Sequence, residues 1–98
     1  MEINKNLDGD ALELKIIGRL DTTTAPALEA EVKNSLEGLK SIVFDLEGLE
    51  YISSAGLRVL LSAQKSMNKQ GTMKLVNVNE VVMEVFEITG FVDVLTIE

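Results

Sequence analysis

The chain has 98 residues, of which 46% are hydrophobic and 26% charged, and its formal net charge is −7. It has neither cysteine nor histidine, and no long apolar run or apolar N-terminal core, so we expect one compact cytoplasmic domain that folds without disulfides or metals. The acidic balance argues against binding to nucleic acid or to an anionic membrane surface, and it favours attraction of a basic protein partner.

The first part of the chain predicts a hairpin followed by a helix. Residues 2–7 alternate weakly and residues 12–16 alternate cleanly, with a tight turn predicted at the Asp-Gly-Asp of residues 8–10. The threonines at 22–24 are candidate N-caps of an amphipathic helix that Gly38 is expected to end. Its apolar residues at helical spacing are Ala25, Leu28, Val32, Leu36 and Leu39.

The rest of the chain predicts alternating strands and helices. Residues 41–46 form a nearly continuous apolar run, which is typical of a central strand buried on both faces. We expect a helix from the serine pair at 53–54 to about residue 69, a strand over 73–78, a third helix from Asn79 to Gly90, and a last short strand within 91–97. The predicted apolar face of the third helix is Val81, Val82, Val85 and Phe86. This order predicts an α/β fold, with a mixed sheet of about four to five strands packed with helices.

The side chains of most catalytic mechanisms are missing. Without histidine or cysteine the chain cannot build a Ser-His-Asp site, a Cys-His site or a thiolate cluster, and it has no phosphate-binding glycine loop. Two groups of carboxylates are candidate paired acids or magnesium ligands: Asp8 with Asp10, and Asp45 with Glu47 and Glu50. The first pair suits turn chemistry, and the second group lacks a known ligand spacing. The sequence therefore predicts a binding protein without catalytic residues, metal or cofactor.

The serine pair Ser53-Ser54 directly precedes an apolar helical stripe. A serine there commonly caps the helix, because its hydroxyl accepts a hydrogen bond from a free backbone N–H of the first turn. A phosphate at the same place would lie near the positive end of the helix dipole, and it would add roughly −1.5 to −2 charge. Helix cap and modification site both stay open on the residues alone.

The order of motifs resembles that of the STAS domain, the fold of bacterial anti-sigma-factor antagonists. Gly-Arg-Leu-Asp at 18–21 precedes the first helix, an apolar strand follows at 42–46, and the segment 51–61 contains Ser-x-Gly-Leu. The resemblance covers essentially the whole chain and implies a single STAS domain over residues 1–98.

The resemblance implies a non-enzymatic regulator of transcription that works by partner switching. In that family the serine two residues before Gly-Leu is phosphorylated, and the matching residue is Ser54; Asp21 matches an aspartate near that serine. The unphosphorylated form would bind, as a monomer, an anti-sigma factor with serine kinase activity; phosphorylation would reverse the binding and a phosphatase would reset it. The implied partner-binding residues are Asp21, Thr22, Ser53, Ser54, Gly56 and Arg58.

One residue departs from the family pattern, which commonly has aspartate directly before the phosphorylated serine. Ser53 stands there, so either it caps the helix instead, or kinase recognition differs, or Ser54 is no longer phosphorylated. The last alternative implies an unregulated STAS subunit of a larger signalling or lipid-transport assembly. Asp21 is either a turn residue or a partner contact, Arg58 either a solvated charge or a contact, and Leu57 is expected in the core.

Overall fold

A computed structural model describes all 98 residues. The predicted opening hairpin is confirmed: β1 and β2 are antiparallel, and Gly9 in their turn has a φ of 62°. The strands are β1 (Glu2–Asp8), β2 (Ala11–Leu20), β3 (Ser41–Asp45), β4 (Leu49–Ile52) and β5 (Thr72–Val76), and the helices are α1 (Ala25–Ser35), α2 (Ser54–Asn68), α3 (Glu80–Thr89) and a short 3-10 helix (Phe91–Asp93). No helix has the length and apolar character that crossing a membrane requires.

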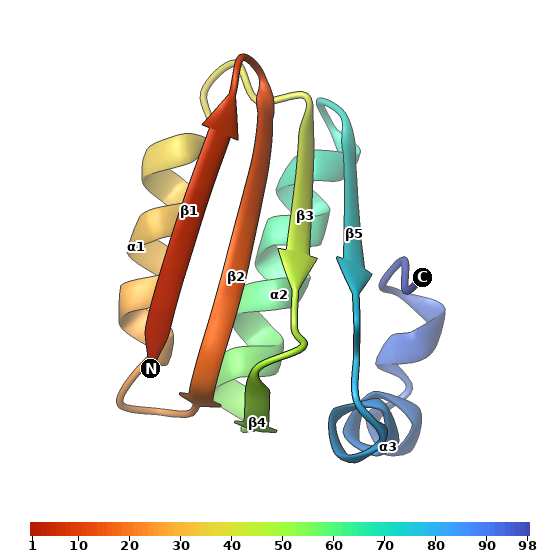
Figure 1. Cartoon of the computed structure of the whole chain (residues 1–98). Coiled ribbons are helices and arrows are strands. Elements are labelled where there is room, and N and C mark those ends of the chain that lie inside the picture. The colour runs from red at the N-terminus through yellow and green to blue at the C-terminus, as the bar shows by residue number, and fades with distance from the viewer.

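The sheet is mixed, and its long strand β2 has different neighbours along its length (Figure 1). The main order is β1-β2-β3-β5, and the pairs after the hairpin are parallel. A register shift between Gly18 and Arg19 then turns the end of β2 toward β4, which pairs with it in parallel. This short strand was not predicted, because only four residues carry it and their apolar pattern is too brief.

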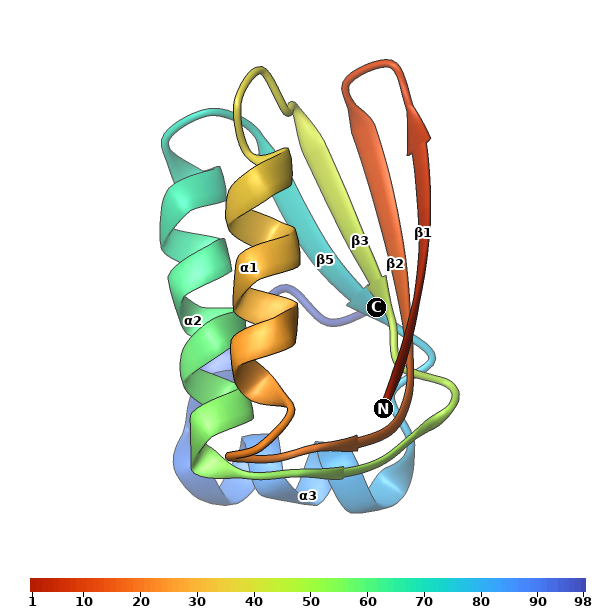
Figure 2. The ribbon, with the colours of Figure 1, turned by 90° about the vertical axis from the view of Figure 1, so that its left-hand side faces the viewer.

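Two helices cover one face of the sheet, and the third closes its end (Figure 2). Helices α1 and α2 pack over the apolar side chains of β2, where Leu12, Leu14 and Ile16 are almost fully buried. Helix α3 lies across the end of the sheet at β4. The opposite sheet face carries no helix. The side chains of β2 therefore alternate as predicted, with one set facing the helices and the other set facing solvent.

The prediction that residues 41–46 are buried on both faces is wrong. Ile42 and Phe44 are buried, but Ser41 and Val43 are only half-buried on the uncovered face of the sheet. A continuous apolar run is typical of a strand covered on both sides, and here β3 is central only within the plane of the sheet.

Helix α1 is shorter than predicted. It ends at Ser35, and Leu39 is buried outside the helix instead of on its apolar face. The side-chain amide of Gln70 donates to the carbonyl oxygens of Leu36 and Leu39, at 2.6 and 2.7 Å, and so satisfies acceptors beyond the helix end. Thr24 occupies the N-cap position without capping through its side chain.

The limits of α3 agree with the prediction, but two details after β5 differ. Asn79 Oδ1 accepts the backbone N–H of Val82 at 2.9 Å, and Gly90 ends the helix with a φ of 81°. Val81, predicted on the apolar face, is 61% exposed, because α3 packs against the sheet end on one side only. In place of a last strand, residues 91–93 form a 3-10 helix, and one bridge joins Leu75 to Ile97.

Candidate functional site

The candidate site lies where β2 and β4 end side by side. Leu20 pairs with Ile52 in the parallel register, and the backbone N–H of Ser53 donates to the carbonyl oxygen of Leu20 at 2.9 Å. The chain continues from Leu20 into Asp21 and from Ile52 into the serine pair. The unpredicted strand β4 therefore brings together the two motifs that the sequence placed far apart.

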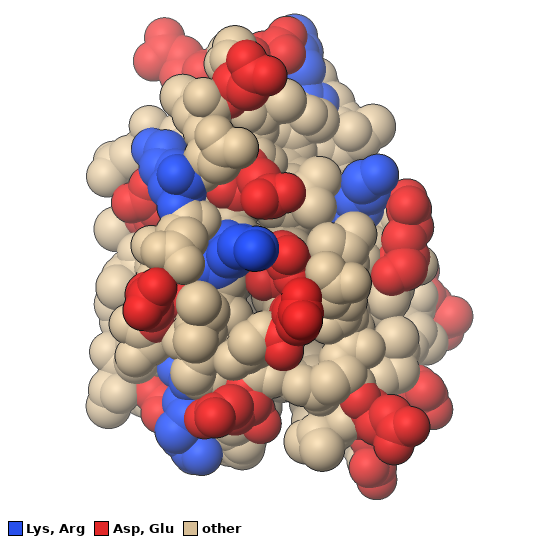
Figure 3. All heavy atoms as spheres, in the orientation of Figure 1, with Lys and Arg blue, Asp and Glu red and all other residues tan.

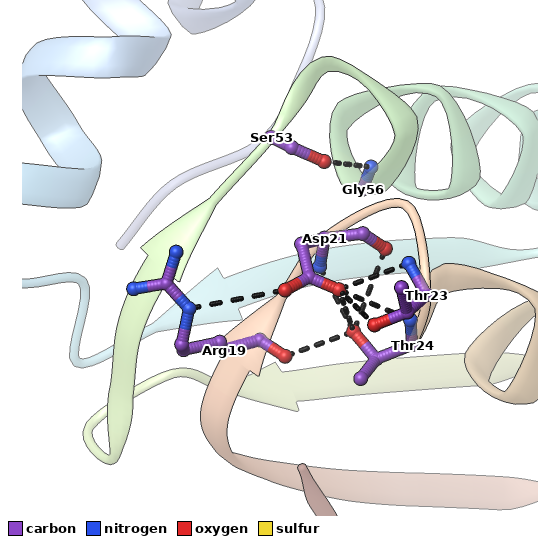
Figure 4. A network of polar contacts seen from close by, with 6 residues as sticks. All are labelled: Arg19, Asp21, Thr23, Thr24, Ser53 and Gly56. Carbon is purple, nitrogen blue, oxygen red and sulfur yellow. Dashed lines mark hydrogen bonds and ion pairs between the residues drawn. The ribbon is translucent and has the colours of Figure 1, made fainter.

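The structure assigns different positions to the two serines. Ser53 is the N-cap of α2: its extended backbone precedes the helix, and its Oγ accepts the backbone N–H of Gly56 at 3.4 Å (Figure 4). Ser54 is the first helical residue; it is exposed, and its hydroxyl makes no hydrogen bond within the chain. The geometry shows that Ser53 caps the helix, while kinase recognition and phosphorylation of Ser54 stay predictions.

Asp21 organises the turn that leads into α1. Its Oδ1 accepts the backbone N–H of Thr23 at 3.0 Å, the hydroxyl of Thr23 at 2.7 Å and the backbone N–H of Thr24 at 3.2 Å (Figure 4). The hydrogen bond from the Thr23 hydroxyl, followed by the bonds from these backbone groups and the Thr24 hydroxyl, lowers the pKa of the Asp21 carboxyl despite some desolvation. The carboxylate is therefore ionised at neutral pH and is directed toward Thr23, Thr24 and Arg19 (Figure 4).

Arg19 and Tyr51 flank the site and were not identified from the sequence. They are partners in the β2–β4 register, and the Arg19 guanidinium carbon lies 4.3 Å from the centre of the Tyr51 ring, a cation–π contact. Arg19 Nε also lies 3.8 Å from Oδ2 of Asp21. The pairing depends on β4, so no pattern in the sequence indicates it.

Of the other predicted site residues, two are exposed on the surface and one is buried beneath it. Thr22 and Arg58 are both exposed, and they line one shallow hollow of about 370 Å³ between α1 and α2. Gly56 is buried: a Cβ there would lie 2.7 Å from Leu20 Cγ and 2.9 Å from Ile52 Cγ1, so glycine lets α2 approach the ends of the two strands. Leu57 is in the core, as predicted.

The sequence comparisons establish the family. The profile of the STAS domain matches residues 2–98, and the chain belongs to this family. The protein BtrV of Bordetella bronchiseptica is 40% identical over 82 residues, which cover 82% of this chain and 71% of BtrV. The anti-sigma-B factor antagonist of Bacillus subtilis is 31% identical over 87 residues, which cover 88% of this chain and 80% of that protein.

Solved structures confirm the predicted fold class. The anti-sigma factor antagonist SpoIIAA in its unphosphorylated form superposes with a TM-score of 0.86 at 17% identity, covering 99% of this chain and 88% of SpoIIAA. The phosphorylated form of the Bacillus SpoIIAA superposes with a TM-score of 0.79 at 16% identity, covering 99% and 91%. The fold is thus the mixed sheet with packed helices of SpoIIAA.

Proposed function

We propose that this chain is an anti-sigma factor antagonist that binds its anti-sigma factor through the start of α2 while Ser54 is unmodified. The observation that carries the proposal is the exposed Ser54 hydroxyl, which is free of hydrogen bonds because Ser53 caps the helix. The relatives named as anti-sigma-B factor antagonists support this function. Residues 1–98 act as one domain and one monomer, without catalytic residues of their own.

The anti-sigma factor is also the kinase of the switch. It transfers the terminal phosphoryl group of ATP to Ser54 Oγ, the bond to ADP breaks, and a base of the kinase takes the hydroxyl proton. A separate phosphatase hydrolyses the ester and restores binding. Thr22 and Arg58, which line one exposed hollow, and Asp21 contact the partner around the serine pair, while Gly56 supports the site from below.

The position of Ser54 suits a modification that changes binding and leaves the fold intact. The phosphate would lie at the positive end of the α2 dipole, which stabilises negative charge. It would add roughly −1.5 to −2 charge to a site that already holds the ionised Asp21. A partner that packs closely on the unmodified surface would then meet the bulk of the phosphate and would have to remove water from the added charge. The existence of SpoIIAA structures in both forms supports a fold that accommodates the phosphate.

The test is binding of the serine-kinase anti-sigma factor from the same genome to three variants, measured by calorimetry. Ser54→Ala should bind like the wild type, whereas Ser54→Asp should lose affinity by about 10- to 100-fold, because a charge is placed in the contact surface. Asn34→Asp adds one negative charge at an exposed residue near the C-terminal end of α1, outside the hollow lined by Thr22 and Arg58, and should change affinity less than about threefold.

Incubation with the kinase and ATP should add one phosphate to the wild type and none to Ser54→Ala, as read by mass spectrometry. Wild-type affinity in both Ser54 variants, with no phosphoserine formed, would reject the switch. That result would instead identify a permanent subunit of a larger assembly.

A further inference from the structure

The negative charge of the chain is concentrated at its C-terminal end. After Lys74 the sequence has no lysine or arginine, and residues 75–98 contribute −5 of the net charge of −7. Figure 3 shows the consequence: acidic side chains gather over α3 at the lower right of the view, with no basic side chain among them. Apart from Glu98, which pairs with Lys74, these carboxylates make no ion pair.

Helix α3 also exposes apolar side chains within this acidic surface. Val81 and Ile88 are 61% and 77% exposed, the highest values among the large hydrophobic residues. They are separated by seven positions and so lie on one helix face, with Glu84 between them. The opposite face, with Val82 and Phe86, is buried. The outer face of α3 is thus an apolar stripe among carboxylates, without any partner in the chain.

This face lies at the same end of the molecule as Ser54. The side-chain amide of Asn79, the N-cap of α3, donates to the carbonyl oxygen of Leu49 at 2.7 Å and so fixes α3 to β4. The other end of β4 is Ile52, which leads directly into the serine pair. In Figure 2, α3 runs across the end at which α2 begins. A protein that covers the start of α2 therefore approaches α3 as well.

We infer that the outer face of α3 is a second contact surface for the anti-sigma factor, and that this partner presents there an apolar patch bordered by lysine or arginine. The inference rests on the proposed function and adds the chemistry of the partner. The partner's apolar patch would cover Val81 and Ile88, whose exposure to water is otherwise unfavourable. Basic side chains around it match the acidic rim, whereas an acidic surface would be repelled.

The experiment measures association and dissociation rates of the same anti-sigma factor by surface plasmon resonance, at about 0.05 M and about 0.5 M salt. Ile88→Ser removes apolar contact and should raise the dissociation rate about tenfold. The double variant Glu84→Lys/Glu87→Lys should slow association about tenfold at low salt, and the difference should shrink at high salt because the charges are then screened. All three residues are exposed, so thermal unfolding should be nearly unchanged.

The matched control is Glu13→Lys/Glu37→Lys, which makes the same change in net charge at exposed positions away from α3. It should alter the association rate less than about twofold, because local complementarity and not net charge steers the approach. If the α3 variants behave like this control while Ser54→Asp loses binding, the inference is overturned and the proposed function stands. If Ser54→Asp also binds like the wild type, the proposed function fails, and the inference fails with it.

Discussion

Asp21 fixes the turn between β2 and α1 through one carboxylate oxygen that accepts several hydrogen bonds. These bonds lower its pKa, so the folded state favours the ionised form more than the unfolded state does. The resulting stabilisation is present above the ordinary pKa of aspartate and is lost as the pH falls through the lower pKa of the folded state.

Asp21→Asn should therefore unfold at a lower temperature than the wild type at neutral pH, and the gap should narrow as the pH is lowered from about 5 to about 2. Asparagine keeps one acceptor oxygen but has no charge to lose. The difference between the variant and the wild type therefore reports what the ionised carboxylate contributes to stability. Thermal unfolding across this range measures the effect. Asp93→Asn removes an exposed carboxylate that accepts no side-chain hydrogen bond, and it controls for the loss of charge alone. A gap of constant size would contradict the prediction.

Gly56 supports the serine pair from inside the molecule. Gly56→Ala in a helix interior ordinarily stabilises by about 0.5–1 kcal/mol, but here the new methyl group would overlap Leu20 and Ile52. We expect a net loss of about 1–3 kcal/mol in the free energy of unfolding, measured by urea denaturation. Ser62→Ala, an exposed substitution on the same helix, should change it by less than about 0.5 kcal/mol. A more stable Gly56→Ala would show that α2 has room to move away from the strands.

At the scale of elements, the sequence predicts those whose pattern is long enough. The hairpin, α2 and α3 are where the alternation and helical spacing placed them, and Asn79 and Gly90 bound α3 as their chemistry suggests. Strand β4 was missed because four residues do not establish a period. Leu39 was assigned to α1 because it continues the apolar spacing of that helix, although the helix ends at Ser35. Contacts distant in the sequence, such as those of Gln70, decide such ends.

The candidate site, like the elements, was predicted from the sequence only in part. Ser54 and Asp21 were named because they lie in sequence motifs, and the structure places the two motifs side by side. The choice of Ser53 as the cap needed backbone geometry, because either serine of the pair has the right chemistry. Arg19 and Tyr51 were beyond prediction, since their contact exists only through the β2–β4 register.

The whole molecule has a covered and an uncovered side. Helices α1 and α2 protect one face of the sheet, while the other face shows mixed basic and acidic residues to solvent (Figure 3). The edge strand β1 carries Glu2, Lys5 and Asp8, and charged residues on an edge oppose pairing with a second sheet. The surface over α3 is the exception, because it carries acidic residues without basic ones. The end of the molecule at α3 is therefore more negative than the other end.

The division of β2 between two neighbours implies that the sheet does not open as one unit. Leu14 and Leu20 are both fully buried, but Leu14 is paired with Lys5 on one side and Phe44 on the other, whereas Leu20 is paired with Ile52 alone. Local unfolding should therefore begin at the end of β2 that lies next to the serine pair. In hydrogen exchange we expect the backbone amide of Leu20 to exchange at least about tenfold faster than that of Leu14. Equal protection would mean a single cooperative sheet. With unequal protection, a bound partner would slow exchange chiefly at Leu20, so the region proposed to meet the partner is also the one whose order the partner can most increase.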